Sequence, residues 1–409
     1  MTGERVLLLD GQTTQALACA RSFGRAGSAV LVASTRTRPL AGWSRFCVER
    51  VRLSGETLSA FAALRTRAQA LAVTVVMPLT ERSMLLLNAD REAWERAGIT
   101  VGCAPAAALD AALDKARTID TARACGVAVP ATREPTSMAE CFAAVREVGL
   151  PCVVKARFSS VWYGARLLRD GGASYVRRIE ELEDAVRRHR QGSFWPIIQA
   201  FVPGRGKGVF TVCDRGRPLA WFAHERVRDV RPTGSGSSVR RAAPLDPRLR
   251  EPAERLLAAM RWHGPAMVEF RDPGEGAPWL MEVNGRFWGS LQLAVSAGVD
   301  FPRMWLGVLR GETPSPPAGF REGLTLRWLW GDAKRLMYVM AGPPPGFPGL
   351  YPTRWQGLRE VLGRQPAGTH SETWDRDDPW PAVGEWVQGF GEILERRSGT
   401  RPKGQSAIA

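Results

Sequence analysis

The chain has 409 residues, enough for two or three domains that each bury a core of their own. No uncharged apolar run reaches the ~18 residues of a membrane-spanning helix, the first apolar run is too short for a signal peptide, and seven cysteines without a CxxC pair predict reduced thiols in a cytoplasmic protein. The formal net charge of +15 is compatible with an anionic partner, but no zinc-finger spacing or aromatic–basic RNA-binding motif accompanies it.

The first part of the chain alternates short apolar runs with helical patterns. Strands are predicted at residues 6–9, 29–33, 73–78 and 99–101, and helices at 16–23, 56–71 and 85–98. This alternation predicts a parallel sheet with helices on its faces over residues 1–110. Asp10-Gly11 and Thr80-Glu81-Arg82 follow strands, where open sheets hold ligands, so they are substrate-site candidates, with a pair of ordinary loops as the alternative. No GxGxxG follows the first strand, so a dinucleotide site is not predicted there.

Residues 111–195 are predicted to form a smaller α+β lobe. Helices are expected at 106–126, 140–149 and 179–190, and an apolar strand at 150–155 ends in Lys155. A lysine at the end of a buried strand indicates either phosphate binding or a structural ion pair. The Ser- and Gly-containing residues 156–173 could form a hairpin loop over a phosphate.

Lysine is rare in a chain that uses arginine almost everywhere. The only lysines are Lys115, Lys155, Lys207, Lys334 and Lys403. Lysine is a compact charge that can approach a single phosphate oxygen, whereas arginine is a planar fork. Lys115, within a helix, and Lys155 are therefore candidate phosphate ligands, whereas Lys403 lies in a polar tail.

Residues 196–312 are predicted to form a larger lobe. It begins with an apolar strand at 196–204, continues with a hairpin at 208–213 and 218–224, and contains helices at 249–261, 290–297 and 303–310. The Gly- and Ser-rich residues 231–238 are flanked by Arg228, Arg231, Arg240 and Arg241. They indicate either a mobile loop that closes over an anion or a solvated linker.

A second hairpin, residues 266–286, carries the most specific pattern. Its strands alternate, so Met267, Glu269 and Arg271 share one face, as do Leu280, Glu282 and Asn284. Folding the hairpin can bring Glu269 beside Glu282, where the two carboxylates would repel unless a cation lay between them. Two carboxylates and an amide oxygen suit Mg²⁺, which fills its other positions with water and phosphates. Arg286 could then meet a phosphate or carboxylate bidentately.

The last residues, 313–409, are predicted to be a helical extension. The segment contains RWLWGDAKRLMYVM, a Pro/Gly-rich stretch at 342–352 and an amphipathic helix near 383–397. The tail after Arg397 is predicted to be disordered.

These motifs, in this order, resemble the ATP-grasp superfamily over about residues 1–312. Glu269 followed by EVNGR at 282–286 is similar to the family's metal signature, and Lys115 and Lys155 resemble its two nucleotide-binding lysines. IQAFV at 198–202 resembles the hinge strand whose backbone reads adenine, although the acid usual after Gln199 is Ala200 here. Among the branches, RWHGPAMVEF and NGRFWGSLQLAVSAGVDFP look most like stand-alone bacterial carboxylate–amine (or carboxylate–thiol) ligases.

The resemblance implies an ATP-grasp fold: a Rossmann-like pre-ATP-grasp domain, two α+β lobes that clasp ATP, and here a C-terminal helical appendage. It implies an ATP-dependent ligase that forms an acylphosphate and joins it to an amine or thiol, with small-molecule substrates and a possible homodimer. The expected ligands of Mg²⁺ (or Mn²⁺) are Glu269, Glu282 and Asn284. The expected nucleotide set is Lys115, Lys155, Gln199, Ala200, Phe201, Val202 and Lys207, the last where the family often has an acid for the ribose. The expected catalytic arginines are Arg286, Arg240 and Arg241.

Three alternatives stay open from the sequence. The altered hinge is compatible with a nucleotide-binding regulatory module that performs no ligation. A biotin-carboxylase-like enzyme that uses bicarbonate is also compatible with the motifs. The charge alone suggests a basic nucleic-acid-binding protein.

Overall fold

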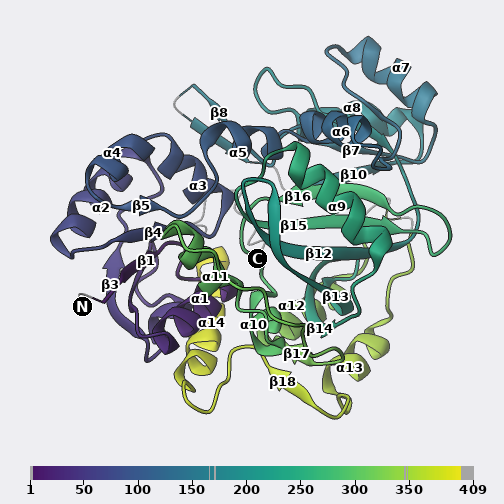
Figure 1. Ribbon diagram of the computed structural model, residues 1–409. Coiled ribbons are helices and arrows are strands. Elements are labelled where there is room, and N and C mark those ends of the chain that lie inside the picture. Colours follow the sequence, from purple (N-terminus) through teal and green to yellow (C-terminus); the bar gives the residue numbers. More distant parts are fainter. Residues whose placement is uncertain (1–2, 165, 170–171, 345–346, 348, 398–409) are drawn as a thin grey trace.

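A five-stranded parallel sheet begins the chain in the computed structural model, which describes residues 3–164, 166–169, 172–344, 347 and 349–397 (Figure 1). The strand order is β3-β2-β1-β4-β5, and helices cover the sheet as the alternating pattern predicts. The elements are β1 (Arg5–Leu8), α1 (Thr14–Arg25), β2 (Ala29–Ser34), the 3-10 helix η1 (Leu40–Trp43), β3 (Cys47–Arg52), α2 (Leu58–Ala70), β4 (Val75–Met77), α3 (Glu81–Asn88), α4 (Arg91–Arg96) and β5 (Thr100–Val101).

Two details of this sheet differ from the sequence prediction. The strand β3 was not predicted, because the sequence CVERVR places charged side chains on a half-exposed edge strand. The single helix expected at 85–98 is two helices, α3 and α4, since Asp90 leaves the helical conformation between them.

The smaller lobe follows two short helices, α5 (Ala106–Leu113) and α6 (Lys115–Ala124). Its four-stranded sheet has the order β10-β7-β11-β6 and is covered by α7 (Met138–Val148) and α8 (Leu182–His189). The strands are β6 (Thr132–Arg133), β7 (Cys152–Lys155), β10 (Ala173–Val176) and β11 (Ile197–Ala200), and β8 (Ser160–Tyr163) pairs with β9 (Arg166–Arg169) in a separate hairpin. That hairpin lies in the loop expected at 156–173, of which residues 165, 170 and 171 lie outside the described residues.

The predicted boundary between the lobes is displaced. β11 was assigned to the larger lobe, but it pairs with β7 and β6 in the smaller one. The larger lobe therefore begins after Ala200. Strand pairing decides this boundary, and the apolar pattern of the strand does not reveal its partner.

The larger lobe is a seven-stranded sheet with the order β16-β15-β12-β13-β14-β17-β18, whose strands run in colour from teal (β12) to yellow (β18) in Figure 1. Its elements are β12 (Arg205–Asp214), β13 (Arg217–Arg231), β14 (Ser235–Ala242), α9 (Pro247–Ala259), β15 (Gly264–Asp272), β16 (Trp279–Asn284), α10 (Leu291–Ala297) and α11 (Phe301–Leu309). Leu249, Ala253, Leu256 and Leu257 of α9 pack on one face. Apolar residues of α10 and α11 share a core with α1 and the first sheet.

The structure contradicts both interpretations of residues 231–238, the mobile loop and the solvated linker. Those residues form the tight turn between β13 and β14 and the first half of β14 itself. The flanking arginines lie in paired strands, and three of them contact the C-terminal segment. Arg228 pairs with Asp332, Arg231 donates to the Tyr338 hydroxyl at 3.3 Å, and Arg240 pairs with Glu372.

The C-terminal segment is mostly helical, with α12 (Leu329–Ala341), α13 (Arg354–Leu362) and α14 (Trp380–Arg397). It also supplies β17 (Thr325–Arg327) and β18 (Thr369–Ser371), which extend the seven-stranded sheet at one edge. The predicted disordered tail after Arg397 lies outside the described residues. All seven cysteines are free, as the reduced-thiol prediction requires. Within the described part of the chain, every helix is too short or too polar to cross a bilayer.

Candidate active site

The β15–β16 hairpin places Glu269 directly opposite Glu282 and Met267 opposite Asn284, which confirms the predicted pairing of the two acids. Turn-forming Pro and Gly residues at 273–278 connect the strands and fix this register. On the other side of β15, Glu269 lies opposite Gly208 of β12, which has no side chain to cover it. The two carboxylates therefore share one open stretch of the sheet face.

Two polar neighbours hold these acids. Arg226 Nη2 of β13 donates to Glu269 Oε2 at 3.0 Å, and Asn284 Nδ2 donates to Glu282 Oε1 at 3.1 Å. Burial raises the pKa of Glu269, Arg226 opposes that shift, and the neighbouring Glu282 carboxylate adds to it. A buried carboxylate whose neighbour is also a carboxylate gains most from a cation placed between the two.

Lys155 and Lys115 face these acids from the smaller lobe. Lys155 Nζ donates to Gln199 Oε1 at 2.9 Å, and Lys115 Nζ donates to Ser159 Oγ at 3.1 Å. Burial lowers the pKa of Lys155 to about 8; the Glu282 charge opposes this shift, and the Lys115 charge adds to it. The structure therefore brings the two predicted lysines and the two predicted acids into one electrostatically coupled cluster between the lobes.

Arg286 connects the hairpin to the first domain. Its Nη2 lies 3.5 Å from Asn284 Oδ1, and its Nε lies 3.8 Å from Glu81 Oε1 at the start of α3. The guanidinium thus lies beside the metal-type donors and at the carboxyl edge of the first parallel sheet. That edge is where open α/β sheets hold ligands.

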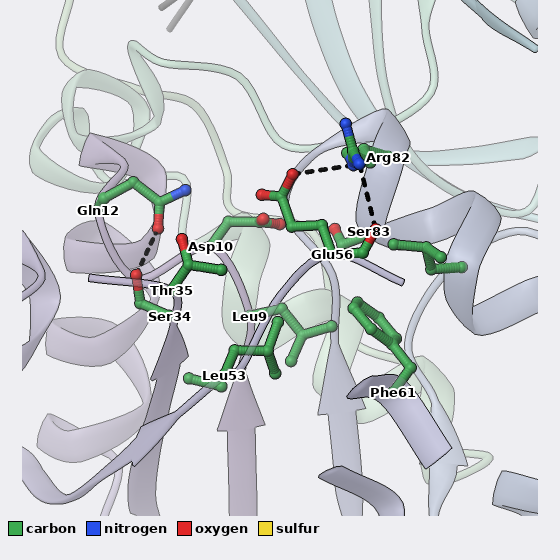
Figure 2. A pocket seen from close by; sticks show the side chains of 12 residues that line it. Leu9, Asp10, Gln12, Ser34, Thr35, Leu53, Glu56, Phe61, Arg82 and Ser83 are labelled. Carbon is green, nitrogen blue, oxygen red and sulfur yellow. Dashed lines mark hydrogen bonds and ion pairs between the residues drawn. The ribbon is translucent and has the colours of Figure 1, made fainter. Parts of the chain in front are cut away.

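A small crevice opens at this edge, over the ends of β1, β2 and β3 and beside α3, and Figure 2 shows its side chains. Its volume of about 10 Å³ is close to that of one water site. Ser83 Oγ donates to Asp10 Oδ2 at 2.6 Å, and burial raises the pKa of Asp10. Arg82 and Glu56 form an ion pair of 2.8 Å at the rim. Asp10 and Arg82, which the sequence places in two separate candidate segments, therefore line one crevice.

Some polar groups of the hinge segment, residues 198–202, form hydrogen bonds within the protein. Gln199 is buried between Lys155 and Thr132, whose hydroxyl accepts its Nε2–H at 2.9 Å. The backbone N–H groups of Ala200 and Phe201 donate to the carbonyls of Ala131 and Pro151. A base bound along this segment would have to be read by its other backbone groups, including those of Val202.

Lys207 and Arg241 lie away from the cluster. Lys207 pairs with Phe270 across β12 and β15, so its side chain is on the face opposite Glu269, where its Nζ lies 2.6 Å from Asp272 Oδ2. Arg241 lies opposite Glu225 in β13 and forms an ion pair with it. Sequence spacing did not reveal that both side chains point away from the acids.

Arg240 is on the same face as the acids but is not in a mobile loop. It is buried in β14, opposite Arg226, and its charge is paired with Glu372 of the C-terminal segment. Between it and the acids, Arg226 is the guanidinium that contacts Glu269, and the sequence analysis missed it. The available signal was the alternation in AHERVR, which places His224 and Arg226 on one face of β13.

His224 lies beside these arginines and is neutral. Burial, together with Arg240 and Arg226, lowers the pKa of His224 well below its ordinary value. Its Nε2 is 2.7 Å from the Ser290 hydroxyl, and its ring stacks on Phe210. These contacts make it a packed histidine that supports the sheet face.

Comparison with known proteins agrees with this geometry. Residues 197–331 match the profile of a family described as "ATP-grasp in the biosynthetic pathway with Ter operon". The D-alanine–D-alanine ligase of Ectopseudomonas mendocina (strain ymp) is 27% identical over 215 residues, which cover 48% of this chain and 64% of that enzyme. The match thus spans less than two thirds of the curated relative.

Solved structures of low sequence identity share the fold. Biotin carboxylase of Campylobacter jejuni, solved as a β-γ-ATP complex, superimposes with a TM-score of 0.63 at 14% identity, covering 78% of this chain and 74% of that one. The N5-carboxyaminoimidazole synthetase of Staphylococcus aureus, complexed with ADP, gives a TM-score of 0.60 at 14% identity, covering 77% of this chain and 79% of that one. The fold, the paired acids and the profile match over residues 197–331 together give the chain an ATP-grasp fold and make this part of it similar to the ATP-grasp family.

Proposed function

We propose that the protein is an ATP-dependent ligase that activates a substrate carboxylate as an acylphosphate and joins it to an amine, or to a thiol, with release of ADP and phosphate. The observation that carries this proposal is the cluster of Glu269, Glu282, Lys155 and Lys115, drawn from two lobes that face each other. Acids with an amide beside them, opposite a pair of ammonium groups, suit a polyphosphate with its metal.

The donor set fits Mg²⁺ or Mn²⁺ only with help from the substrate. Among the residues that the structure describes, no group of three or more His, Cys, Asp or Glu side chains could hold a metal by itself. Glu269 and Glu282 would supply carboxylate oxygens and Asn284 its amide oxygen, and ATP phosphates and water would complete the shell. Such a cation would neutralise the charge that develops on the phosphate oxygens.

The chain's own residues position the reacting groups. Lys155 and Lys115 would hold phosphate oxygens, and the backbone of residues 199–202 would receive the adenine. Phosphoryl transfer between oxygens requires positioning and charge neutralisation and no protein nucleophile. Arg286 would bind the substrate carboxylate bidentately, because its guanidinium lies between Asn284 and the carboxyl edge of the first sheet.

The polar edge around the crevice of Figure 2 supports a place for the nucleophilic substrate, which would bind outside the crevice because its volume of about 10 Å³ admits only a water molecule. The crevice adjoins α3, whose Glu81 lies 3.8 Å from Arg286, and its rim carries both Glu56 and Arg82. A small polar molecule with an amine and an acid group would find partners for both. The free thiols of all seven cysteines support the predicted cytoplasmic location.

The test is ADP release from a panel of carboxylates, including bicarbonate, with amines and thiols, followed by mass spectrometry of the product. We expect Glu282→Gln and Asn284→Ala to reduce Mg²⁺-dependent ADP release by at least ~100-fold while the circular dichroism spectrum stays unchanged. Glu275→Gln, an exposed acid in the turn of the same hairpin, is the matched control and should retain activity. Full activity in both site variants would refute the assignment. ATP binding without ADP release from any mixture would favour a regulatory module instead.

A further inference from the structure

Helix α14 is attached to the molecule by both polar and apolar contacts. Its side toward the protein carries Glu385, Gln388 and Glu392, of which the two glutamates are buried. Gln388 Oε1 accepts from the Leu40 N–H at 3.1 Å, and Glu392 Oε1 lies 3.4 Å from Arg36 Nη2. Ile393 packs near Trp330, whose ring also contacts those of Trp386 and Phe390, yet several large apolar side chains of the helix keep much of their surface exposed.

Five of these exposed side chains form a regular stripe. Trp380, Val383, Val387, Phe390 and Leu394 are separated by three and four residues in turn and are between 45% and 65% exposed. On an α-helix this spacing gives a narrow seam along one side, the pattern by which one helix packs along another. A contiguous exposed apolar patch of this kind marks an interaction site.

The three glycines within α14 differ in what surrounds them, and Gly391 supports an interaction at the stripe. Gly384 and Gly389 have a packing reason, since an added Cβ would lie 2.4 Å from the rings of Trp43 and Trp330, respectively. An added Cβ on Gly391 would meet nothing within 4 Å. Glycine weakens a helix interior, and Gly391 lies beside the stripe, where it would let a second helix approach closely.

We propose that this stripe is a dimerisation surface, occupied by α14 of a second copy of the chain in an antiparallel pair. The stripe is nearly symmetric in sequence about Val387: a twofold axis there would place Val387 against its own copy, Val383 against Phe390, and Trp380 against Leu394. In both of the unlike pairs a large aromatic side chain meets a smaller aliphatic one, which is the complementarity that packed helices need.

The exposed area of the stripe is sufficient for such a pair. At 45–65% exposure, its five side chains offer on the order of 500 Å² from each copy, or about 1,000 Å² in total. That is the lower end of the range for specific interfaces, so the dimer is expected to dissociate in the roughly micromolar range.

The sequence of the helix argues against two other occupants. Helices that lie on anionic membranes carry lysine and arginine along their apolar face, whereas α14 has basic residues only at its C-terminal end, Arg396 and Arg397, and glutamates elsewhere. The tail at 398–409 reads SGTRPKGQSAIA, in which Ile408 is the only large apolar residue, too little to cover five large side chains.

The full chain should show a mass that rises from monomer to dimer with concentration in sedimentation equilibrium. Val387→Glu places two like charges at the axis and should weaken association by more than ~100-fold. Val48→Glu, an exposed valine of β3, is the matched control and should associate like the wild type. The proposal would be overturned if the wild type stayed monomeric at a protein concentration ~100-fold above the expected, roughly micromolar dissociation constant. A Val387→Glu variant that still dimerises would overturn it as well.

Cross-linking tests the geometry separately. Under mild oxidation Val387→Cys should give a covalent dimer, whereas Leu394→Cys, facing Trp380 of the other copy, should not link to itself. Linking of both variants would indicate a parallel pair and overturn the antiparallel arrangement. Two further results would overturn the proposal. One is binding of a monomer to phosphatidylglycerol vesicles that Val387→Glu abolishes. The other is a dimer that forms only after removal of residues 398–409, which would mean that the tail covers the stripe in the full chain.

Discussion

Lys155 shows how a single side chain is prepared for a ligand. It ends a buried strand, its amine is held by Gln199, and burial lowers its pKa to about 8 from an ordinary value of 10.5. Burial therefore works against the charged form in the ligand-free protein. A bound phosphate would favour the charged form, so ATP binding and protonation of Lys155 should reinforce each other.

We expect kcat/KM for ATP to fall as pH rises through about 8, because the free protein then loses the Lys155 proton. Lys155→Arg keeps its charge at every accessible pH, so its profile should lack this step even if its activity is lower. The measurement is the initial rate of ADP release at low ATP from pH 6.5 to 9.5. The same step in both proteins would assign it to another group.

At this scale the sequence predicted residue types better than side-chain directions. Glu269, Glu282 and Lys155 were found because charged side chains in apolar strands are unusual, and Lys115 was found because lysine is rare in this chain. Lys207 was misplaced because its face depends on the register of β12 against β15, and the sequence does not state that register. Arg226 was missed because it is one of many arginines.

The β15–β16 hairpin and its continuation act as one element. Gly285 lies between Asn284 and Arg286, and a Cβ added there would be 2.3 Å from the ring of Trp262. Trp262 is fully buried, and its Nε1 donates to the Pro265 carbonyl at 3.1 Å, so it cannot move aside without loss. The ring therefore supports the backbone from which the amide and the guanidinium project.

Gly285→Ala should lower the free energy of unfolding by about 1–3 kcal/mol, since it overpacks the contact with Trp262. It should also reduce ADP release more than that loss of stability explains, because Asn284 and Arg286 would shift with the backbone. Urea denaturation and initial rates measure the two effects. Gly55→Ala, where an added Cβ meets nothing within 4 Å, is the control. Wild-type values for both effects would show that the contact is not restrictive.

Element predictions succeeded where local chemistry decides the structure. Turn residues and alternation identified the β15–β16 hairpin and the pairing of Glu269 with Glu282. The prediction that Leu280 shares a face with Glu282 is wrong, because the register shifts between Glu269 and Phe270 and Leu280 pairs with Phe270 in the core. β14 was misread because Gly and Ser residues favour turns locally, although pairing with β13 and β17 makes the segment a strand. Such long-range pairing also decides which lobe contains β11.

For the whole molecule, the C-terminal segment ties the first domain to the large sheet. Asp378 is fully buried and accepts from Arg21 Nε at 2.9 Å, from the Ser44 hydroxyl at 2.8 Å and from the Arg45 N–H at 2.8 Å. Burial lowers the pKa of Arg21, and the hydrogen bond that Arg21 donates to Asp378 opposes that shift. β18 and Glu372, a few residues earlier, attach the same segment to β17 and β14.

Asp378→Ala should destabilise the protein by about 3–5 kcal/mol, because it leaves the buried Arg21 guanidinium without its acid. Thermal unfolding at neutral pH should show a clearly lower Tm. The exposed neighbour provides the control, since Asp377→Ala should change Tm little. A loss below ~1 kcal/mol for Asp378→Ala would mean that solvent reaches Arg21 when the acid is removed.

The separation in sequence between Arg21 and Asp378 has a consequence for synthesis on the ribosome. The first domain emerges early, but the acid that its buried guanidinium requires is 357 residues further along the chain. Until then the nascent chain would carry an uncompensated charge in its first core and an incomplete sheet in its large lobe. Chains released early should therefore be marginal and open to proteolysis, so that only complete translation products persist in the cell.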